Sequence, residues 1–499
     1  MSREAFEQFP WKNPHRAYDN SLIAMKPAPE FATAEVLLAA AYRAVGYSSH
    51  QESAVPAAGR NFDKASAKVR RKSGERVSAE TWKTILHGAL QSPKQPKQSS
   101  KRFLSLCPIV PDASLYSGSA RLAGNPWNPG VLLGRMIAAG CATQAEVEET
   151  WDLLFRGLSV THEDDIWARW LQGEFEARRS LGVTWERATA PVGPQFDQRD
   201  LSLIEIPAQQ FVQDLRAVLL AKGSMTRRQW ISILEAVLRL GSVAHVLWIC
   251  EVHERLWRTL RDLLLGHPVM SQEQCTKQLF SGVGRPLVYG ATALPLIRDL
   301  ASRYLHARLG VNLLLWELEV VGNPVRELSS TQDLHDMLVV VNKHRAAINA
   351  SDFAERFGSL CDRSAKELAC KKGVGNNIVE FCRYALSQRQ TADVTLRGYD
   401  QGYQLRKKAE YASAPWVVSL GAVALLAFTH CCLREAASPR SVLRLCEHLG
   451  RYGIDVDRDD IAQSELGMRL RMLGLVLDSP DAESGMLLVP PFEMTPASS

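Results

Sequence analysis

The stretch MTRRQWISILEAVLRLGSVAHVLWICEVHERLWRTLRDLLLG, residues 225–266, is one long pattern with helical periodicity. Apolar residues recur along it at i, i+3, i+4 and i+7, which places them on one face of an α-helix. The pattern ends at Gly266, a residue type that commonly terminates helices. Residues 225–266 therefore predict a long helix within an α-helical body.

The same period extends over much of the chain on both sides of this stretch. It recurs in residues 33–47, 78–90, 144–158, 163–182 and 208–223, and another helix is expected to begin near Val131. Ser78 is a suitable N-cap for the helix at 78–90. Residues 311–321 fit either a buried helix or a strand. The sequence predicts a mainly α protein. A helical solenoid is an alternative that no recognisable fixed-period repeat supports.

Composition and length place the chain among folded, soluble, multi-domain proteins. It has 499 residues, of which 46% are hydrophobic and 23% charged. Four regions are expected: a basic N-terminal region with short helices (1–115), a helical body (116–350), a basic Arg/Tyr-rich helical segment (351–412) and a winged-helix-like domain (413–499).

One apolar stretch raises the question of a membrane. Residues 415–433, PWVVSLGAVALLAFTHCCL, approach the minimum spanning length but contain Ser419, Thr429 and His430. We interpret them as a buried helix, with a transmembrane helix as the alternative. The first twenty residues lack an apolar signal region, and the ten cysteines have no regular spacing. A cytoplasmic protein is therefore expected, with no membrane partner.

Residues 413–499 show the order of three helical patterns followed by a hairpin, which predicts a winged helix. The first helix is the apolar one at 415–433. Ser438 and Pro439 are expected to begin the second helix, and Asp459 or Asp460 to cap the third. Residues 475–478 and 486–489 flank a polar loop, as the two strands of a wing do.

The outward face of the third helix decides whether this domain reads DNA. That face is predicted to hold Ile461, Ser464, Met468 and Arg471. Of these, only Arg471 suits a guanine edge or a phosphate. Four carboxylates in DVDRDD, residues 455–460, lie at the helix entrance, and the net charge from residue 440 to the end is −4. Since phosphate contacts supply most non-specific affinity for DNA, we expect this acidic domain to contact a protein.

Two other regions are better candidates for binding nucleic acid, expected to be DNA. Residues 60–102 carry a net charge of +9, whereas the whole chain carries only +5. The second region interleaves tyrosines with cations, which can stack on bases and bind the backbone. The predicted contact residues are Lys64, Lys68, Arg70, Arg71, Lys72, Arg76, Lys101 and Arg102 in the first region, and Arg397, Tyr399, Tyr403, Arg406, Lys407 and Lys408 in the second.

Known catalytic and cofactor motifs are not recognisable in the sequence. SGVGRPLVYG and KKGVGNN lack the Gly-Lys-Ser/Thr of a P-loop, and CEVHERLW does not match His-Glu-x-x-His. Cys361, Cys370 and Cys382 are too far apart for a structural zinc site. We therefore predict no catalytic residue, no cofactor and no metal.

The resulting hypothesis is a non-enzymatic, nucleic-acid-binding accessory subunit of a bacterial DNA-processing or phage-defence assembly. The bacterial setting is suggested by the Ala-, Arg- and Leu-rich style of the chain. Two alternatives belong to other classes. One is a winged-helix transcription regulator that reads an operator, and the other is a nuclease with scattered catalytic residues.

Overall fold

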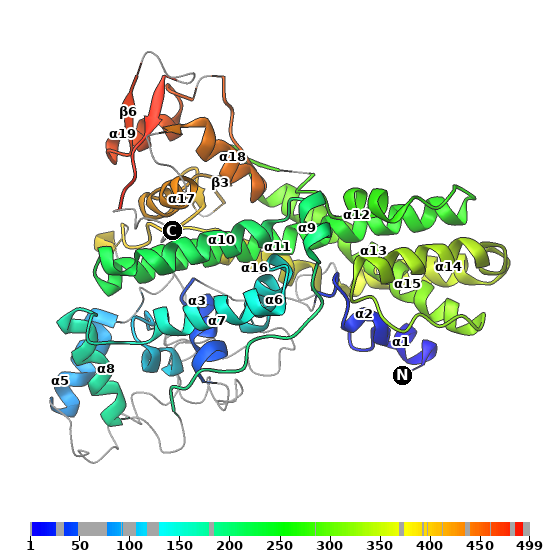
Figure 1. The fold of residues 1–499 in the computed structure, drawn as a ribbon, viewed down its shortest axis with the longest axis horizontal. Helices are drawn as coiled ribbons and strands as arrows, with labels where there is room; N and C mark the ends of the chain where they lie inside the picture. The colour runs from blue at the N-terminus through cyan, green and yellow to red at the C-terminus, as the bar shows by residue number, and fades with distance from the viewer. Residues whose placement is uncertain are drawn as a thin grey trace.

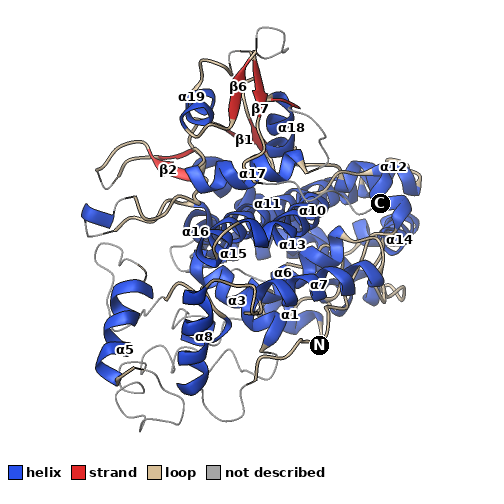
Figure 2. Ribbon diagram, turned by 60° about the vertical axis from the view of Figure 1, so that its left-hand side comes forward, coloured by secondary structure: helices blue, strands red, loops and turns tan. Residues whose placement is uncertain are grey.

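The computed structural model describes most of the chain. The described residues are 2–25, 34–47, 77–90, 92, 106–116, 129–178, 184–284, 286–368, 374–391, 394–396, 398–411, 413–434, 440–459, 461–479 and 485–492. They are mainly helical, as the sequence predicts (Figures 1 and 2).

The body is built around the helix predicted at 225–266, which is α11 (Arg227–Leu264). Thr226 caps its first turn by accepting a hydrogen bond from the Gln229 backbone N–H. The helices packed around α11 are α3 (Ala34–Gly46), α6 (Pro129–Gly140), α10 (Pro207–Leu220), α12 (Gln272–Phe280), α13 (Leu294–Val320), α14 (Thr331–Ala350), α16 (Val374–Leu386) and α17 (Ala422–Leu433). Residues 311–321 thus belong almost entirely to a buried helix, α13.

Smaller helices complete the body. They are α1 (Arg3–Gln8), α2 (Arg16–Asp19), α5 (Ala79–Ile85), α7 (Gln144–Leu158), α8 (Ile166–Arg178), α9 (Gln198–Leu203) and α15 (Phe353–Leu368). A π-helical turn, η2 (Leu86–Leu90), continues α5, and the 3₁₀ turns are η3 (Pro111–Tyr116), η4 (Ala221–Ser224) and η5 (Val394–Leu396). Ser78 caps α5, as predicted. A small separate core around Trp82, Leu171 and Phe175 joins α5 to α8.

The length and hydropathy of α11 would suit a membrane span. Among the described residues it is the one helix that meets both criteria, and 94% of its most apolar window is buried inside the protein. This burial is what a core helix of a soluble protein shows, because its neighbours cover it on all sides.

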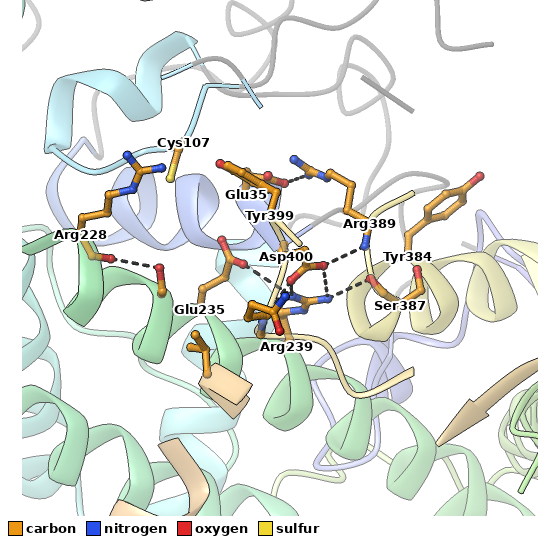
Figure 3. Close-up of a pocket in the computed structure, with 15 residues that line it drawn as sticks. Glu35, Cys107, Arg228, Glu235, Arg239, Tyr384, Ser387, Arg389, Tyr399 and Asp400 are labelled. Atoms are coloured by element: carbon orange, nitrogen blue, oxygen red, sulfur yellow. Dashed lines mark hydrogen bonds and ion pairs between the residues drawn. The ribbon is translucent and has the colours of Figure 1, made fainter. Parts of the chain in front are cut away.

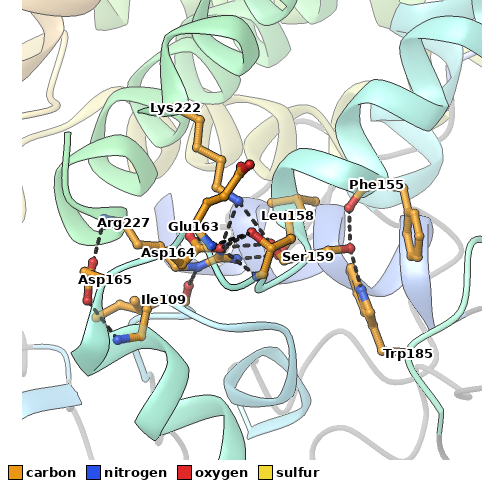
Figure 4. Close-up of polar contacts among 12 residues, drawn as sticks. Ile109, Phe155, Leu158, Ser159, Glu163, Asp164, Asp165, Trp185, Lys222 and Arg227 are labelled. Atoms are coloured by element: carbon orange, nitrogen blue, oxygen red, sulfur yellow. Dashed lines mark hydrogen bonds and ion pairs between the residues drawn. The ribbon is translucent and has the colours of Figure 1, made fainter. Parts of the chain in front are cut away.

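A buried arginine fixes the first turn of α11 against three other segments (Figure 4). The side chain of Arg227 is 0% exposed, and its Nη1 donates to Asp164 Oδ1 at 3.0 Å. Other donors of the same guanidinium reach Tyr42 on α3, the Ile109 carbonyl, and the Leu158 and Ser159 carbonyls at the end of α7. Lys222 Nζ donates to the second Asp164 oxygen at 3.1 Å. These bonds satisfy the buried charges that would otherwise destabilise the body.

The C-terminal module, residues 422–492, contains α17, β4 (Arg440–Ser441), α18 (Leu443–Arg451), β5 (Ile454–Asp455), α19 (Glu465–Met472), β6 (Val476–Asp478) and β7 (Met486–Leu488). Its three-stranded antiparallel sheet has the order β4-β7-β6. Val476 pairs with Leu488 and Asp478 with Met486, so the predicted hairpin is present. In both ribbon views the hairpin and α19 lie at the end of the module remote from the body (Figures 1 and 2).

Besides the apolar packing of α17 and a hydrogen bond from Arg451 to Gln210, two connections attach the module to the body. The first is a short parallel pairing of β5 with β1 (Leu287–Val288). The second is a buried carboxylate on α10: Asp214 Oδ2 accepts hydrogen bonds from His448 Nε2 and from the Tyr452 hydroxyl, each at 2.8 Å. Because Asp214 is 0% exposed, water cannot replace either partner.

Three boundaries differ from the sequence prediction. Residues 415–433 are not one helix: Trp416–Val418 form β3, which pairs with β2 (Leu405–Lys407), and α17 begins only after Gly421. The β-branched Val417 and Val418 favour the strand. The second helix begins at Leu443 with Val442 as its N-cap, and Ser438 and Pro439 lie outside the described residues. The third helix is capped by Ser464 rather than by Asp459 or Asp460.

Candidate interaction face of the C-terminal module

The helix α19 is short because the chain turns sharply just before it. The Ser464 hydroxyl accepts a hydrogen bond from the Gly467 backbone N–H at 3.1 Å, which starts the helix. A Cβ on Gly467 would lie 2.2 Å from the Ile461 carbonyl oxygen, so this close approach requires glycine. The helix that follows has eight residues, about two turns.

The first arginine of α19 points back toward the β2–β3 hairpin and the turn that follows it. Arg469 Nη2 lies 2.8 Å from Glu465, and Nη1 donates to the Leu420 carbonyl at 2.6 Å. Glu465 also accepts a hydrogen bond from Arg406 of β2 at 2.8 Å. These contacts hold α19 against the β2–β3 hairpin and leave neither cation unpaired.

The second arginine is paired with the wing. Arg471 contacts the Asp478 carboxylate of β6 through both Nε and Nη2, at 3.0 and 2.8 Å from Oδ1. These hydrogen bonds lower the pKa of Asp478 and raise that of Arg471. The pair fixes the end of α19 to β6 and neutralises the one predicted face residue that could read DNA.

What remains exposed on α19 is apolar. Met468 and Met472, one turn apart, are 52% and 85% exposed, and Leu477 on the adjoining β6 is 57% exposed. We call these three residues the apolar face. Such a grouping of large side chains on a short helix and its hairpin is typical of a protein-contact surface.

The structure separates the four residues predicted for this face. Met468 is exposed, Arg471 is paired, Ser464 serves as the N-cap, and Ile461 is buried at 2% exposure. Ile461 is inside because the helix begins four residues after it, so helical periodicity does not apply there. Met472 and Leu477 were missed, although the i, i+4 spacing of Met468 and Met472 is visible in the sequence.

The described part of the Arg/Tyr-rich segment divides into a buried and an exposed portion. Tyr403 is 5% exposed and Arg406 is paired with Glu465, whereas Tyr399 lies at a cavity between α11 and the segment that follows α16. Lys407, Lys408 and Tyr411 lie at the tip of the β2–β3 hairpin, where Tyr411 is 60% exposed and Lys407 Nζ lies 5.7 Å from the Trp416 ring. The hairpin tip thus exposes Lys408 and Tyr411 to solvent beside the exposed Glu410, and α15 exposes Lys366 in the same segment.

Nine predicted contact residues lie outside the described residues. They are Lys64, Lys68, Arg70, Arg71, Lys72, Arg76, Arg397, Lys101 and Arg102.

A search of the described residues finds no group of three or more His, Cys, Asp or Glu side chains that could hold a metal ion. The described cysteines are all free, and burial raises the pKa of Cys361, Cys275 and Cys446 to about 11.

Comparison with known proteins gives no further assignment: no family model matches the chain, and no curated protein does.

Proposed function

We propose that the C-terminal module is a winged helix that contacts a protein, in a non-enzymatic subunit that binds nucleic acid elsewhere. The winged-helix assignment is supported by the element order: α17, β4, α18 and α19, then the β6–β7 hairpin as the wing, with β4 completing the sheet. The main observation in favour of a protein contact is which side chains of α19 are paired and which are exposed. Both of its arginines are paired with carboxylates, while Met468 and Met472 point outward.

The nucleic-acid partner, DNA in this proposal, is assigned to the basic run at 60–102 and to the hairpin tip at Lys407, Lys408 and Tyr411. Lysines that neutralise phosphates displace the counterions bound to DNA, which favours binding. An exposed tyrosine ring can stack on bases. An accessory subunit of a bacterial DNA-processing or phage-defence assembly combines such a DNA contact with a protein contact.

The alternative that this pattern disfavours is an operator-reading regulator. In that case α19 would lie in the major groove and offer donors to base edges. Its exposed Met468 and Met472 offer no donor, and Asp455, Asp457 and Asp459 are exposed nearby and would repel phosphates.

Binding of the purified chain to labelled duplex DNA over a salt series tests the proposal. We expect Lys407→Ala with Lys408→Ala to weaken binding and to reduce the slope of log K against log salt by about 2, because two phosphate contacts are lost. Met468→Ala, Arg471→Ala and Met472→Ala combined should leave affinity and slope unchanged. A matched control is Lys343→Ala with Lys366→Ala, two exposed lysines on α14 and α15.

Arg70→Ala, Arg71→Ala and Lys72→Ala combined test the basic run in the same way, and a shallower salt slope is expected. Loss of affinity in the α19 variant, with the hairpin and basic-run variants unaffected, would favour the operator-reading regulator. No binding of the wild type even at low salt would reject the nucleic-acid role altogether.

A further inference from the structure

A polar stripe follows one face of the central helix of the body. Arg228, Ser232, Glu235 and Arg239 occur at i, i+4, i+7 and i+11 on α11, so their side chains lie in one row. This row forms one wall of a cavity of about 170 Å³ (Figure 3). The other walls come from the first turn of α3, Cys107, Tyr384, Ser387, Arg389, residues 399–402 and Val423. The cavity lies where the body meets α17, which contributes Val423, and it is separate from the apolar face of α19.

Two of the ion pairs around this cavity are complete. Arg239 Nη1 lies 2.8 Å from Asp400 Oδ1, and its Nε donates to the Ala385 carbonyl at the end of α16 at 2.6 Å. Arg389 is paired with Glu35 of α3, which also accepts a hydrogen bond from Ser92. These four charges hold the walls together and neutralise one another.

Two charges on the stripe remain. Glu235 is 16% exposed and lies 3.6 Å from Arg239, whose shorter bonds go to Asp400. The guanidinium of Arg228 is solvent-exposed and makes no ion pair within the part of the chain that the structure describes. The two residues are about 10.5 Å apart along the helix axis, at seven residues of 1.5 Å rise. Figure 3 shows both side chains directed toward the space beside Cys107 and Tyr399.

We propose that this cavity binds a small zwitterion with an amine and a carboxylate at opposite ends, the ammonium contacting Glu235 and the carboxylate contacting Arg228. A ligand portion of about six to seven non-hydrogen atoms fits inside the cavity, since a cavity of about 150 Å³ holds benzene. Glu235 lies inside and Arg228 at the rim, which sets the orientation of the ligand. Tyr399 and Cys107 supply hydroxyl and thiol groups between the two ends.

The thiol of Cys107 lines the site as an uncharged group. Burial raises the pKa of its thiol to about 12, so the thiol stays protonated at neutral pH. A protonated thiol is a poor nucleophile, which favours binding over covalent chemistry.

The binding should depend on pH through Glu235. Burial raises the pKa of this carboxyl to about 7, against the opposing effect of Arg239. Only the ionised carboxylate attracts an ammonium group. A carboxyl with that pKa is about 10% ionised at pH 6 and about 90% at pH 8, so affinity should rise about tenfold between them.

Isothermal titration calorimetry of the full chain with named probes tests the site. The probes are the ω-amino acids from β-alanine to 6-aminohexanoate, with butylamine and butyrate as half-ligands and L-alanine as a zwitterion without separated ends. We expect one of the ω-amino acids to bind more tightly than either half-ligand and than L-alanine. Glu235→Gln should weaken that binding about 10- to 100-fold and abolish its pH dependence. Arg228→Gln should weaken it less, because its side chain is more exposed.

Arg258→Gln, an exposed arginine further along α11, is the matched control and should leave the affinity unchanged. The melting temperature of each variant, measured without probe, shows whether the fold is retained. Three results would overturn the inference: half-ligands that bind as tightly as the ω-amino acids, an unchanged affinity in Glu235→Gln and Arg228→Gln, or no binding of any probe at 10 mM. A dissociation constant of about 10 mM is the weakest affinity of interest.

Discussion

Arg227→Met should destabilise the body by about 3–5 kcal/mol, the usual cost of removing one partner from a buried ion pair. The substitution leaves Asp164 with Lys222 as its remaining cation and removes a donor from carbonyls at Ile109, Leu158 and Ser159. Methionine keeps most of the side-chain volume, so a cavity contributes little to the loss.

Native-state hydrogen exchange measures the loss of stability in the segments that Arg227 contacts. Amides of α7 and of the first turns of α11 should exchange faster in Arg227→Met, by the factor that corresponds to the lost free energy. Arg228→Met is the matched control, because the adjacent side chain is exposed and unpaired among the described residues. Equal protection in Arg227→Met and Arg228→Met would mean that the buried guanidinium does not hold these segments together.

Asp214→Ala should release the C-terminal module from the body, at a cost of about 2–4 kcal/mol. The change removes the acceptor for His448, Tyr452 and Gln210, all at 2.7–2.8 Å, and leaves their buried donors unsatisfied. The connections that remain are the two-residue pairing of β5 with β1, the Arg451–Gln210 and Arg406–Glu465 contacts, and the apolar packing of α17.

Native-state hydrogen exchange of the backbone amides in α18 and β5 measures how far the module separates from the body. The amides of α11 serve as the internal reference. We expect faster exchange in α18 and β5 while α11 stays protected. Gln213→Ala, one position before Asp214 on α10, should resemble the wild type. If the module remained as protected as before, its other contacts with the body would account for its attachment without Asp214.

The helical body could be predicted from the sequence because its helices are long and their apolar faces are regular. Residues 225–266 became α11 and residues 144–158 became α7 with no change of type. A period of 3.6 residues is a local property, so the burial of a helix face can be read without knowing what covers it. Ser78 was likewise recognisable as a cap from neighbouring residues alone.

Short elements were harder to predict, because tertiary contacts decide them. Trp416–Val418 forms a strand only because β2 lies beside it, and Ile461 is buried only because α19 begins at Glu465. The cavity was not predictable at all. Arg239 and Asp400 are 161 residues apart, and nothing local to either residue indicates the pairing.

The apolar face was predictable in part from the sequence. Met468 was placed on the outward face from the sequence, and its preference for a covering partner follows from its side chain alone. The pairing of Arg471 with Asp478 could not be foreseen, because it depends on how the β6–β7 hairpin folds back onto α19. That pairing is what removes the last free cation from this surface.

We propose that the outward face of α19 contacts a protein and not DNA. A photo-crosslinking amino acid at position 472, in the full chain expressed in its source cells, tests this most directly. The same residue at position 265, an exposed leucine on the body, serves as the control. We predict an adduct specific to position 472 that resists nuclease and is degraded by protease. A nuclease-sensitive adduct at position 472 would contradict the claim and place DNA on this helix.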